Sequence, residues 1–146
     1  ISAMPGLASV LAAPLWGRHG DRVGHRYTLA IALLGAGLLY LPHYLVHTAA
    51  QMMVIRFCVG LCTAGILPAA NSVVASAVEP GQTAGALSLL STARWLGSIA
   101  GPLMGGYLSA HFGIRPMFMI TGALLLTSGL SAWHAAHRTA AKANEP

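Results

Sequence analysis

Chemically active side chains are most concentrated in the segment 17–26, Gly-Arg-His-Gly-Asp-Arg-Val-Gly-His-Arg. It contains three glycines, three arginines, two histidines and one aspartate. Glycines let a chain turn tightly, and a carboxylate beside guanidinium groups forms charge-assisted hydrogen bonds. We therefore expect a tight polar turn that presents Asp21 next to arginines.

Arg94 stands alone inside a long apolar run, residues 84–110. It lies about ten residues into that run, or roughly 15 Å, which predicts a position near the middle of a bilayer. A guanidinium there costs several kcal/mol unless it meets water or a partner. The three acids, Asp21, Glu79 and Glu145, all lie in polar segments. The partner is therefore a substrate anion, a backbone carbonyl or an acid outside this chain, so a transport role and a structural role both stay open.

Arg56 is a second arginine within an apolar run, residues 51–78, but only about five residues from its edge. Its long side chain can extend from there to the membrane surface. An interfacial role and a substrate or coupling role both stay open for Arg56.

A glycine-proline pattern fills the later part of the run 84–110. Gly97, Gly101 and Gly105 recur at every fourth residue, followed by Gly106, so one helix face is bare. Pro102 bends such a helix. The pattern is a specific helix-packing motif or generic small-residue packing.

Signatures of enzymes and metal sites are absent from the sequence. It contains no Ser/His/Asp arrangement, zinc-protease motif or Walker loop, so we expect no enzyme. The pairs His43/His47 and His134/His137 have helical spacing but no nearby carboxylate or cysteine, so we expect interfacial histidines and no bound metal. Nucleic-acid binding is not expected either, because the arginines are not interleaved with aromatic residues.

Composition identifies the elements that position these residues. Hydrophobic residues make up 55% of the 146 residues and charged residues only 8%, against roughly 25% in soluble domains. The mean hydropathy is +0.66. These values exclude a soluble fold and predict an integral membrane protein of about five helical spans. The expected spans are 1–16, 28–46, 51–78, 84–110 and 117–136, with a polar tail at 137–146.

Basic residues predict the orientation of these spans. If successive spans alternate in direction, five basic residues outside the apolar runs fall on one side and only Arg115 on the other, so the five-residue side is expected in the cytoplasm. The five basic residues on the cytoplasmic side are Arg18, Arg22, Arg26, Arg138 and Lys142.

The sequence also contains a faint internal repeat. Gly17, Gly24 and Arg26 share their spacing with Gly106, Gly113 and Arg115, which fits an inverted repeat or chance.

The segment 17–26 resembles the cytoplasmic signature of the major facilitator superfamily, Gly-x-x-x-Asp-Arg-x-Gly-Arg-Arg. His25 departs from the signature, because it stands where the family usually has a basic residue. The charge at this position then depends on pH. The resemblance implies a conformational latch between two halves of a carrier. The matching residues are Gly17, Asp21, Arg22, Gly24 and Arg26.

Two other segments are similar to signatures of the drug:proton antiporter branch of that superfamily. Residues 56–60, Arg-Phe-Cys-Val-Gly, resemble the pattern Arg-x-x-Gln-Gly, with Val59 at the glutamine position. Residues 97–106 fit the pattern Gly-x-x-x-Gly-Pro-x-x-Gly-Gly in full.

The resemblance implies an all-α integral membrane bundle in which residues 1–146 form part of the C-terminal half, similar to helices 8 to 12 of twelve. The implied function is proton-coupled export of drugs or other small molecules across the inner membrane by alternating access, driven by the proton gradient without a cofactor. Expected partners are a small-molecule substrate, the lipid bilayer and the N-terminal half of the same carrier. A proton-coupled metabolite uptake carrier and a non-transporting membrane fragment are the alternatives.

Overall fold

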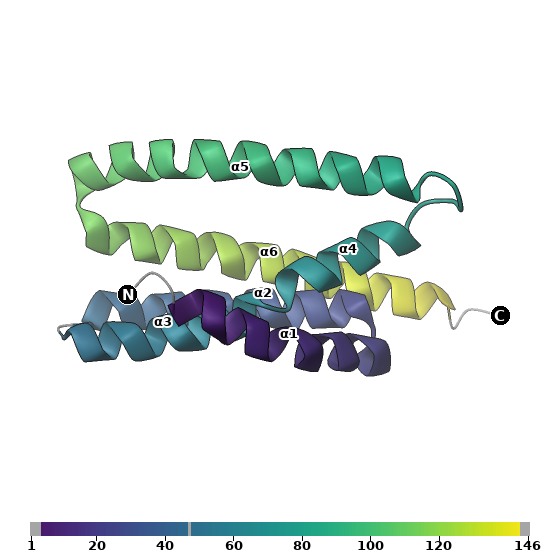
Figure 1. Cartoon of the computed structure of the whole chain (residues 1–146), viewed down its shortest axis with the longest axis horizontal. Coiled ribbons are helices and arrows are strands. Elements are labelled where there is room, and N and C mark those ends of the chain that lie inside the picture. Colours follow the sequence, from purple (N-terminus) through teal and green to yellow (C-terminus); the bar gives the residue numbers. More distant parts are fainter. Residues whose placement is uncertain (1–3, 47, 144–146) are drawn as a thin grey trace.

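The computed structural model describes residues 4–46 and 48–143, which are helical apart from short turns. Figure 1 shows the helices running roughly along the long axis of the molecule. The all-α fold class is confirmed. In chain order the elements are α1 (Met4–Val23), α2 (His25–Tyr40), the 3-10 helix η1 (Leu41–Leu45), α3 (Ala49–Thr63), α4 (Ile66–Ser76), α5 (Thr83–Phe112) and α6 (Ile114–Ala143).

Single glycines separate two pairs of helices. The chain reverses between α1 and α2 at Gly24, whose φ of 99° is rarely adopted by residues with a side chain. Gly113, between α5 and α6, has a φ of 84°. The amide of each glycine donates to the carbonyl four residues earlier, at 2.9 Å. The turn expected over 17–26 is therefore confined to one residue, because most of that segment continues α1.

The third predicted span contains a break, at Ala64 and Gly65 between α3 and α4. Pro68 accounts for it, because proline has no N–H for the carbonyl of Ala64 and its ring crowds that carbonyl. The amide of Gly65 bonds to the carbonyl of Cys62 at 3.3 Å. In a regular helix that amide would bond to Leu61, so the break frees the Leu61 carbonyl.

Taken as one span, α3 and α4 run in the same direction, and the successive spans alternate, so that α1, α4 and α6 end where α2 and α5 begin (Figure 1). We call this the basic end, because Arg18, Arg22, Arg26 and Arg138 lie there. At the opposite end, the ring of His43 in η1 stacks on that of Phe118 in α6, with centroids 4.7 Å apart. The sequence analysis placed these arginines on one side by assuming that successive spans alternate in direction, and the spans of the structure do alternate.

Small residues build the tightest helix pair, α2 against α6. Ala30, Ala32 and Ala36 of α2 are completely buried. A Cβ added at Gly37 would lie 3.0 Å from the backbone nitrogen of Leu126, so the two backbones almost touch. Bare glycine faces allow such close approach between membrane helices.

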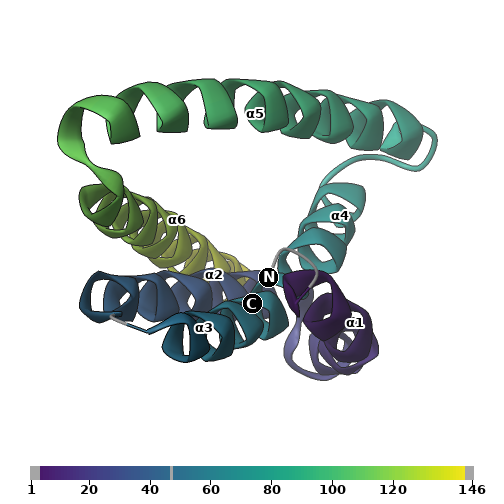
Figure 2. The ribbon, with the colours of Figure 1, turned by 60° about the vertical axis from the view of Figure 1, so that its left-hand side comes forward.

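Helix α5 stands apart from this packed group, as Figure 2 shows. Among the described elements it contacts only α4 and α6, and none of its residues is buried. Its 30 residues extend about 45 Å, more than the roughly 30 Å of a hydrocarbon core.

Two segments of the described chain are by themselves long and apolar enough to cross a membrane, Ala49–Ser76 and Pro116–Thr139. The first joins α3 and α4 across their break, and the second lies within α6. They correspond to the third and fifth predicted spans.

Candidate functional site

The polar segment 17–26 lies at the basic end, on the last turns of α1 and the first turn of α2. The side chain of Asp21 is 74% exposed, and its carboxylate lies 3.7 Å from Nε2 of His25, one helical turn away. This is an ion pair when His25 is protonated, and it is the one ion pair among the described residues. Asp21 therefore contacts the histidine that departs from the family signature rather than an arginine, and it stays open to a further partner.

Two glycines of the segment differ in their surroundings. A Cβ at Gly20 would lie 2.6 Å from Nδ1 of His25, so glycine there makes room for the histidine ring. A Cβ at Gly17 would meet no atom within 4 Å in the described residues. Nothing in the described structure thus requires a glycine at position 17, whereas a surface that docks on α1 would.

Arg26 bonds across the bundle, to the far end of the chain. Its Nη1 donates to Oγ1 of Thr139 on α6, and that hydroxyl donates to the carbonyl of Ala135. Beside it, the ring of Tyr27 meets the rings of Trp133 and His137 edge-on, with centroids 5.5 and 5.4 Å apart. These contacts join α2 to the last turns of α6, which sequence reasoning treated as a separate polar tail.

Arg94 lines a pocket of about 280 Å³ between α4 and α5. It lies on α5 roughly 5 Å from the middle of the helix, on the side of the basic end. Asn71 of α4 and Ser91 of α5 supply polar groups to the same pocket. Within the described residues the guanidinium makes no hydrogen bond or ion pair. Sequence reasoning missed Asn71, although an amide inside a predicted span is an available signal.

Arg56 lies on α3 towards the end opposite the basic end, and it is half-buried. His43 of η1 lies towards the same end of the molecule. His43 is buried, and its Nδ1 donates a hydrogen bond to the carbonyl of Leu39, 3.1 Å away. Arg56 and Arg94 thus belong to separate places in the structure.

The glycine-proline pattern lies on the exposed helix α5. A Cβ at Gly97, Gly101 or Gly106 would meet no atom within 4 Å of it in the described chain. At Gly105 the nearest atom is the terminal methyl of Met117, 3.9 Å away. Pro102 lies inside the helix and leaves the carbonyl of Ser98 without its helical donor. No described helix covers this face.

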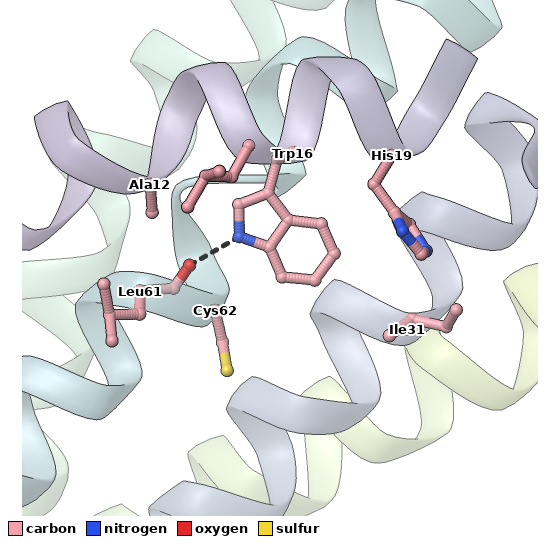
Figure 3. A pocket seen from close by; sticks show the side chains of 7 residues that line it. Ala12, Trp16, His19, Ile31, Leu61 and Cys62 are labelled. Carbon is pink, nitrogen blue, oxygen red and sulfur yellow. Dashed lines mark hydrogen bonds between the residues drawn. The ribbon is translucent and has the colours of Figure 1, made fainter. Parts of the chain in front are cut away.

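A cavity of about 410 Å³ lies between α1, α2 and α3 (Figure 3). Trp16 projects into it, and its indole N–H donates to the freed carbonyl of Leu61 at 2.7 Å. The ring also covers Gly65, where a Cβ would lie 2.5 Å away. Trp16 therefore satisfies the Leu61 carbonyl that the helix break leaves free, and its ring packs against the break. The lining residues are Ala12, Leu15, Trp16, His19, Ile31, Leu61 and Cys62.

Comparison with known proteins gives matches over the whole chain. The family model described as Major Facilitator Superfamily matches residues 1–146. Multidrug resistance protein MdtG of Klebsiella pneumoniae (strain 342) is 32% identical over 146 residues, covering 100% of this chain and 35% of that protein. Multidrug resistance protein MdtG of Escherichia coli O1:K1 / APEC is 34% identical over 139 residues, covering 94% of this chain and 34% of that protein.

The chain thus spans about a third of the length of the curated relatives it matches. Relatives and family model agree with the resemblance carried by segments 17–26 and 97–106. The family is one of multi-pass membrane transporters, as the hydropathy of this sequence requires. Because the family model matches this chain from residue 1 to residue 146, the chain belongs to the major facilitator superfamily.

Proposed function

We propose that this chain is part of a proton-coupled secondary transporter that exports drugs or other small molecules across the cytoplasmic membrane by alternating access. The observation that carries the proposal is Arg94, whose guanidinium lines a pocket between two membrane helices and has no ionic or hydrogen-bonding partner among the residues that the structure describes. A charge at that depth is expensive unless it serves a substrate, a proton pathway or a partner. The similarity to multidrug resistance proteins supports drugs as the substrate class.

Arg94 has the surroundings that a substrate or coupling role requires. The α4–α5 pocket adds an amide and a hydroxyl to the guanidinium, and its remaining walls are largely apolar. Such a mixture of apolar walls and few polar groups is typical of small-molecule sites. In this role Arg94 attracts an anionic group of the substrate or a carboxylate from another part of the carrier, and the proton gradient supplies the energy.

The segment 17–26 acts in this proposal as a conformational latch. Asp21 is exposed, and its one ionic partner among the described residues is His25, across the turn at Gly24. Its carboxylate can therefore bind arginines or helix N-termini of the other half when the cytoplasmic faces come together. The open face at Gly17 supports such a docking contact.

Transport by inside-out membrane vesicles tests the proposed function. Vesicles that contain the carrier with its complete reading frame are acidified inside and given a fluorescent drug outside. We expect the drug to accumulate in the vesicles and a protonophore to release it, with vesicles lacking the carrier as the control. Accumulation in right-side-out vesicles under an inward proton gradient, with none in the inverted ones, would instead identify a proton-coupled uptake carrier.

Thiol labelling tests the membrane and orientation in the proposal. Cysteine at His19 reports the basic end, and cysteine at exposed Thr48 reports the opposite end. In intact cells an impermeant maleimide should label the Thr48→Cys variant and spare the His19→Cys variant until lysis. Labelling of His19→Cys before lysis contradicts a cytoplasmic basic end.

A further inference from the structure

A pocket of about 360 Å³ opens at the basic end, where four helices meet, and most of its wall is apolar. We call it the polar pocket after the arginine, histidine and hydroxyl side chains among its lining residues. Its volume lies within the roughly 300–1,000 Å³ typical of small-ligand sites. Arg26 contributes its cationic group, His25 contributes an imidazole, and Ser76 and Thr139 contribute hydroxyls. The lining residues are Val23, Gly24, His25, Arg26, Tyr27, Ser76, Ala136 and Thr139.

An apolar slot of about 120 Å³ lies next to this pocket and shares Arg26 with it. Its other lining residues are Leu29 of α2, Val73 of α4, and Ala132 and Ala135 of α6. On each helix these residues lie about one turn farther from the basic end than those lining the polar pocket. The slot therefore extends the polar pocket towards the bilayer interior.

Arg26 carries the charge that a ligand of this site must meet. The residue is half-buried, and its hydrogen-bond partner among the described residues is the neutral hydroxyl of Thr139. No carboxylate pairs with Arg26 in the described parts of the chain. A guanidinium has five N–H donors in a planar fork that suits phosphate, and one hydrogen bond to Thr139 leaves most of them available.

The depth of the site in the membrane follows from the aromatic residues beside it. Tyr27 and Trp133 pack together, with ring centroids 5.5 Å apart, and Tyr27 also lines the polar pocket. Tyrosine and tryptophan concentrate at the headgroup level of bilayers. Arg26 is thus at the depth of lipid phosphates, and the apolar slot is at the depth where acyl chains begin.

We propose that the polar pocket and the apolar slot together bind one anionic phospholipid, with its phosphate on Arg26 and the beginning of an acyl chain in the slot. The combination of a cationic mouth and an adjoining apolar slot selects an amphipathic anion over a free one. Basic pockets between membrane helices on the cytoplasmic side are suited to anionic headgroups. His25 also lines this pocket, but its charge when protonated is paired with the carboxylate of Asp21, 3.7 Å away, so Arg26 is the group that recognises the phosphate.

Native mass spectrometry of the delipidated carrier, produced from its complete reading frame, tests this proposal. The probes are phosphatidylglycerol, phosphatidylcholine with the same acyl chains, and inorganic phosphate. We expect one phosphatidylglycerol to bind at least tenfold more tightly than phosphatidylcholine. Arg26→Gln should weaken phosphatidylglycerol binding at least tenfold, whereas Arg138→Gln, an exposed arginine that lines neither cavity, should change it less than twofold.

Further variants keep the test decisive if Arg26→Gln does not fold. Ser76→Asp places a carboxylate in the polar pocket without replacing Arg26, and it should also weaken phosphatidylglycerol binding tenfold. Ala132→Leu fills the apolar slot and should weaken it several-fold. Thermal unfolding in the same detergent identifies the variants that remain folded.

Three results would overturn the proposal. One is equal affinity for the two lipids, and another is less than a twofold loss in both Arg26→Gln and Ser76→Asp. The third is displacement of phosphatidylglycerol by equimolar inorganic phosphate, which would identify a site for a soluble anion instead of a lipid.

Discussion

Glycines serve α2 and α6 in one way and α5 in another. A Cβ at Gly129 of α6 would lie 2.8 Å from the side chain of Leu34, because α2 and α6 are in contact there. A Cβ at Gly101 of α5 would meet nothing within 4 Å in the described residues. The same residue type thus marks a completed helix contact on one side of the molecule and an uncovered helix face on the other.

The arginines follow the same division. Arg26, beside the α2–α6 contact, bonds to Thr139, whereas Arg94 on α5 has no hydrogen-bonding or ionic partner in the residues described. A bare glycine face and an unpaired charge on one helix indicate that α5 works with a surface outside this part of the chain. In the proposed function, the packed α2–α6 side supports folding and the α4–α5 side takes part in transport.

Gly129→Leu should have the largest effect on stability. The added side chain would meet Leu34 side-chain and backbone atoms at 2.8 to 3.0 Å, and backbone cannot move aside without separating α2 from α6. We expect a loss of about 3 kcal/mol or more in the free energy of unfolding, the upper range for overpacking. Unfolding of the complete carrier in detergent measures it, and wild-type stability would refute a close α2–α6 contact.

Gly101→Leu is the matched substitution on α5. Because no described atom lies within 4 Å, we expect little change in thermal stability but at least a tenfold loss of drug export, as the uncovered face can no longer dock. Export assays at matched expression measure the loss. Normal export would mean that this glycine face contacts only lipid.

Asp21→Asn should reduce export several-fold while leaving expression intact. The substitution removes the carboxylate that the latch needs, and the exposed side chain contributes little to folding. Substrate efflux from loaded cells measures the effect. Asp21→Glu, which restores the charge, should recover part of the rate, and unchanged efflux in Asp21→Asn would contradict a latch.

Trp16→Phe should have the smallest effect, confined to the packed side. It removes the indole N–H from the Leu61 carbonyl that the helix break leaves free, at a cost of about 1–2 kcal/mol in stability. Thermal unfolding of the complete carrier measures the loss. A variant as stable as wild type would show that water satisfies this carbonyl.

Much of the fold was predictable from the composition and from the positions of glycine and proline. The apolar runs predicted helical spans, whereas the shared spacing around Gly24 and Gly113 fitted an inverted repeat or chance. In the structure both glycines have a positive φ and the same hydrogen bond to the preceding turn. The break between α3 and α4 could have been placed from Pro68, because proline frees the carbonyl four residues earlier.

Long-range contacts were not predictable in the same way. Arg26 reaches Thr139 across 113 residues, and Trp16 reaches Leu61 across 45. Local sequence patterns do not indicate which helices contact each other. The sequence therefore identified Arg26 as part of a motif but did not identify Thr139 as its hydrogen-bond partner. Asn71 was missed because it becomes a candidate site residue only once the structure places it in the same pocket as Arg94.

Export by Arg94 variants tests most directly whether the α4–α5 side is the transport side. Arg94→Lys keeps the charge but loses the planar fork, and Arg94→Ala removes both. In the complete carrier at matched expression, we expect Arg94→Ala to abolish export and Arg94→Lys to retain part of it, with a greater loss for anionic than for neutral substrates. Export of every tested substrate at the wild-type rate by Arg94→Ala would contradict a transport role for this arginine.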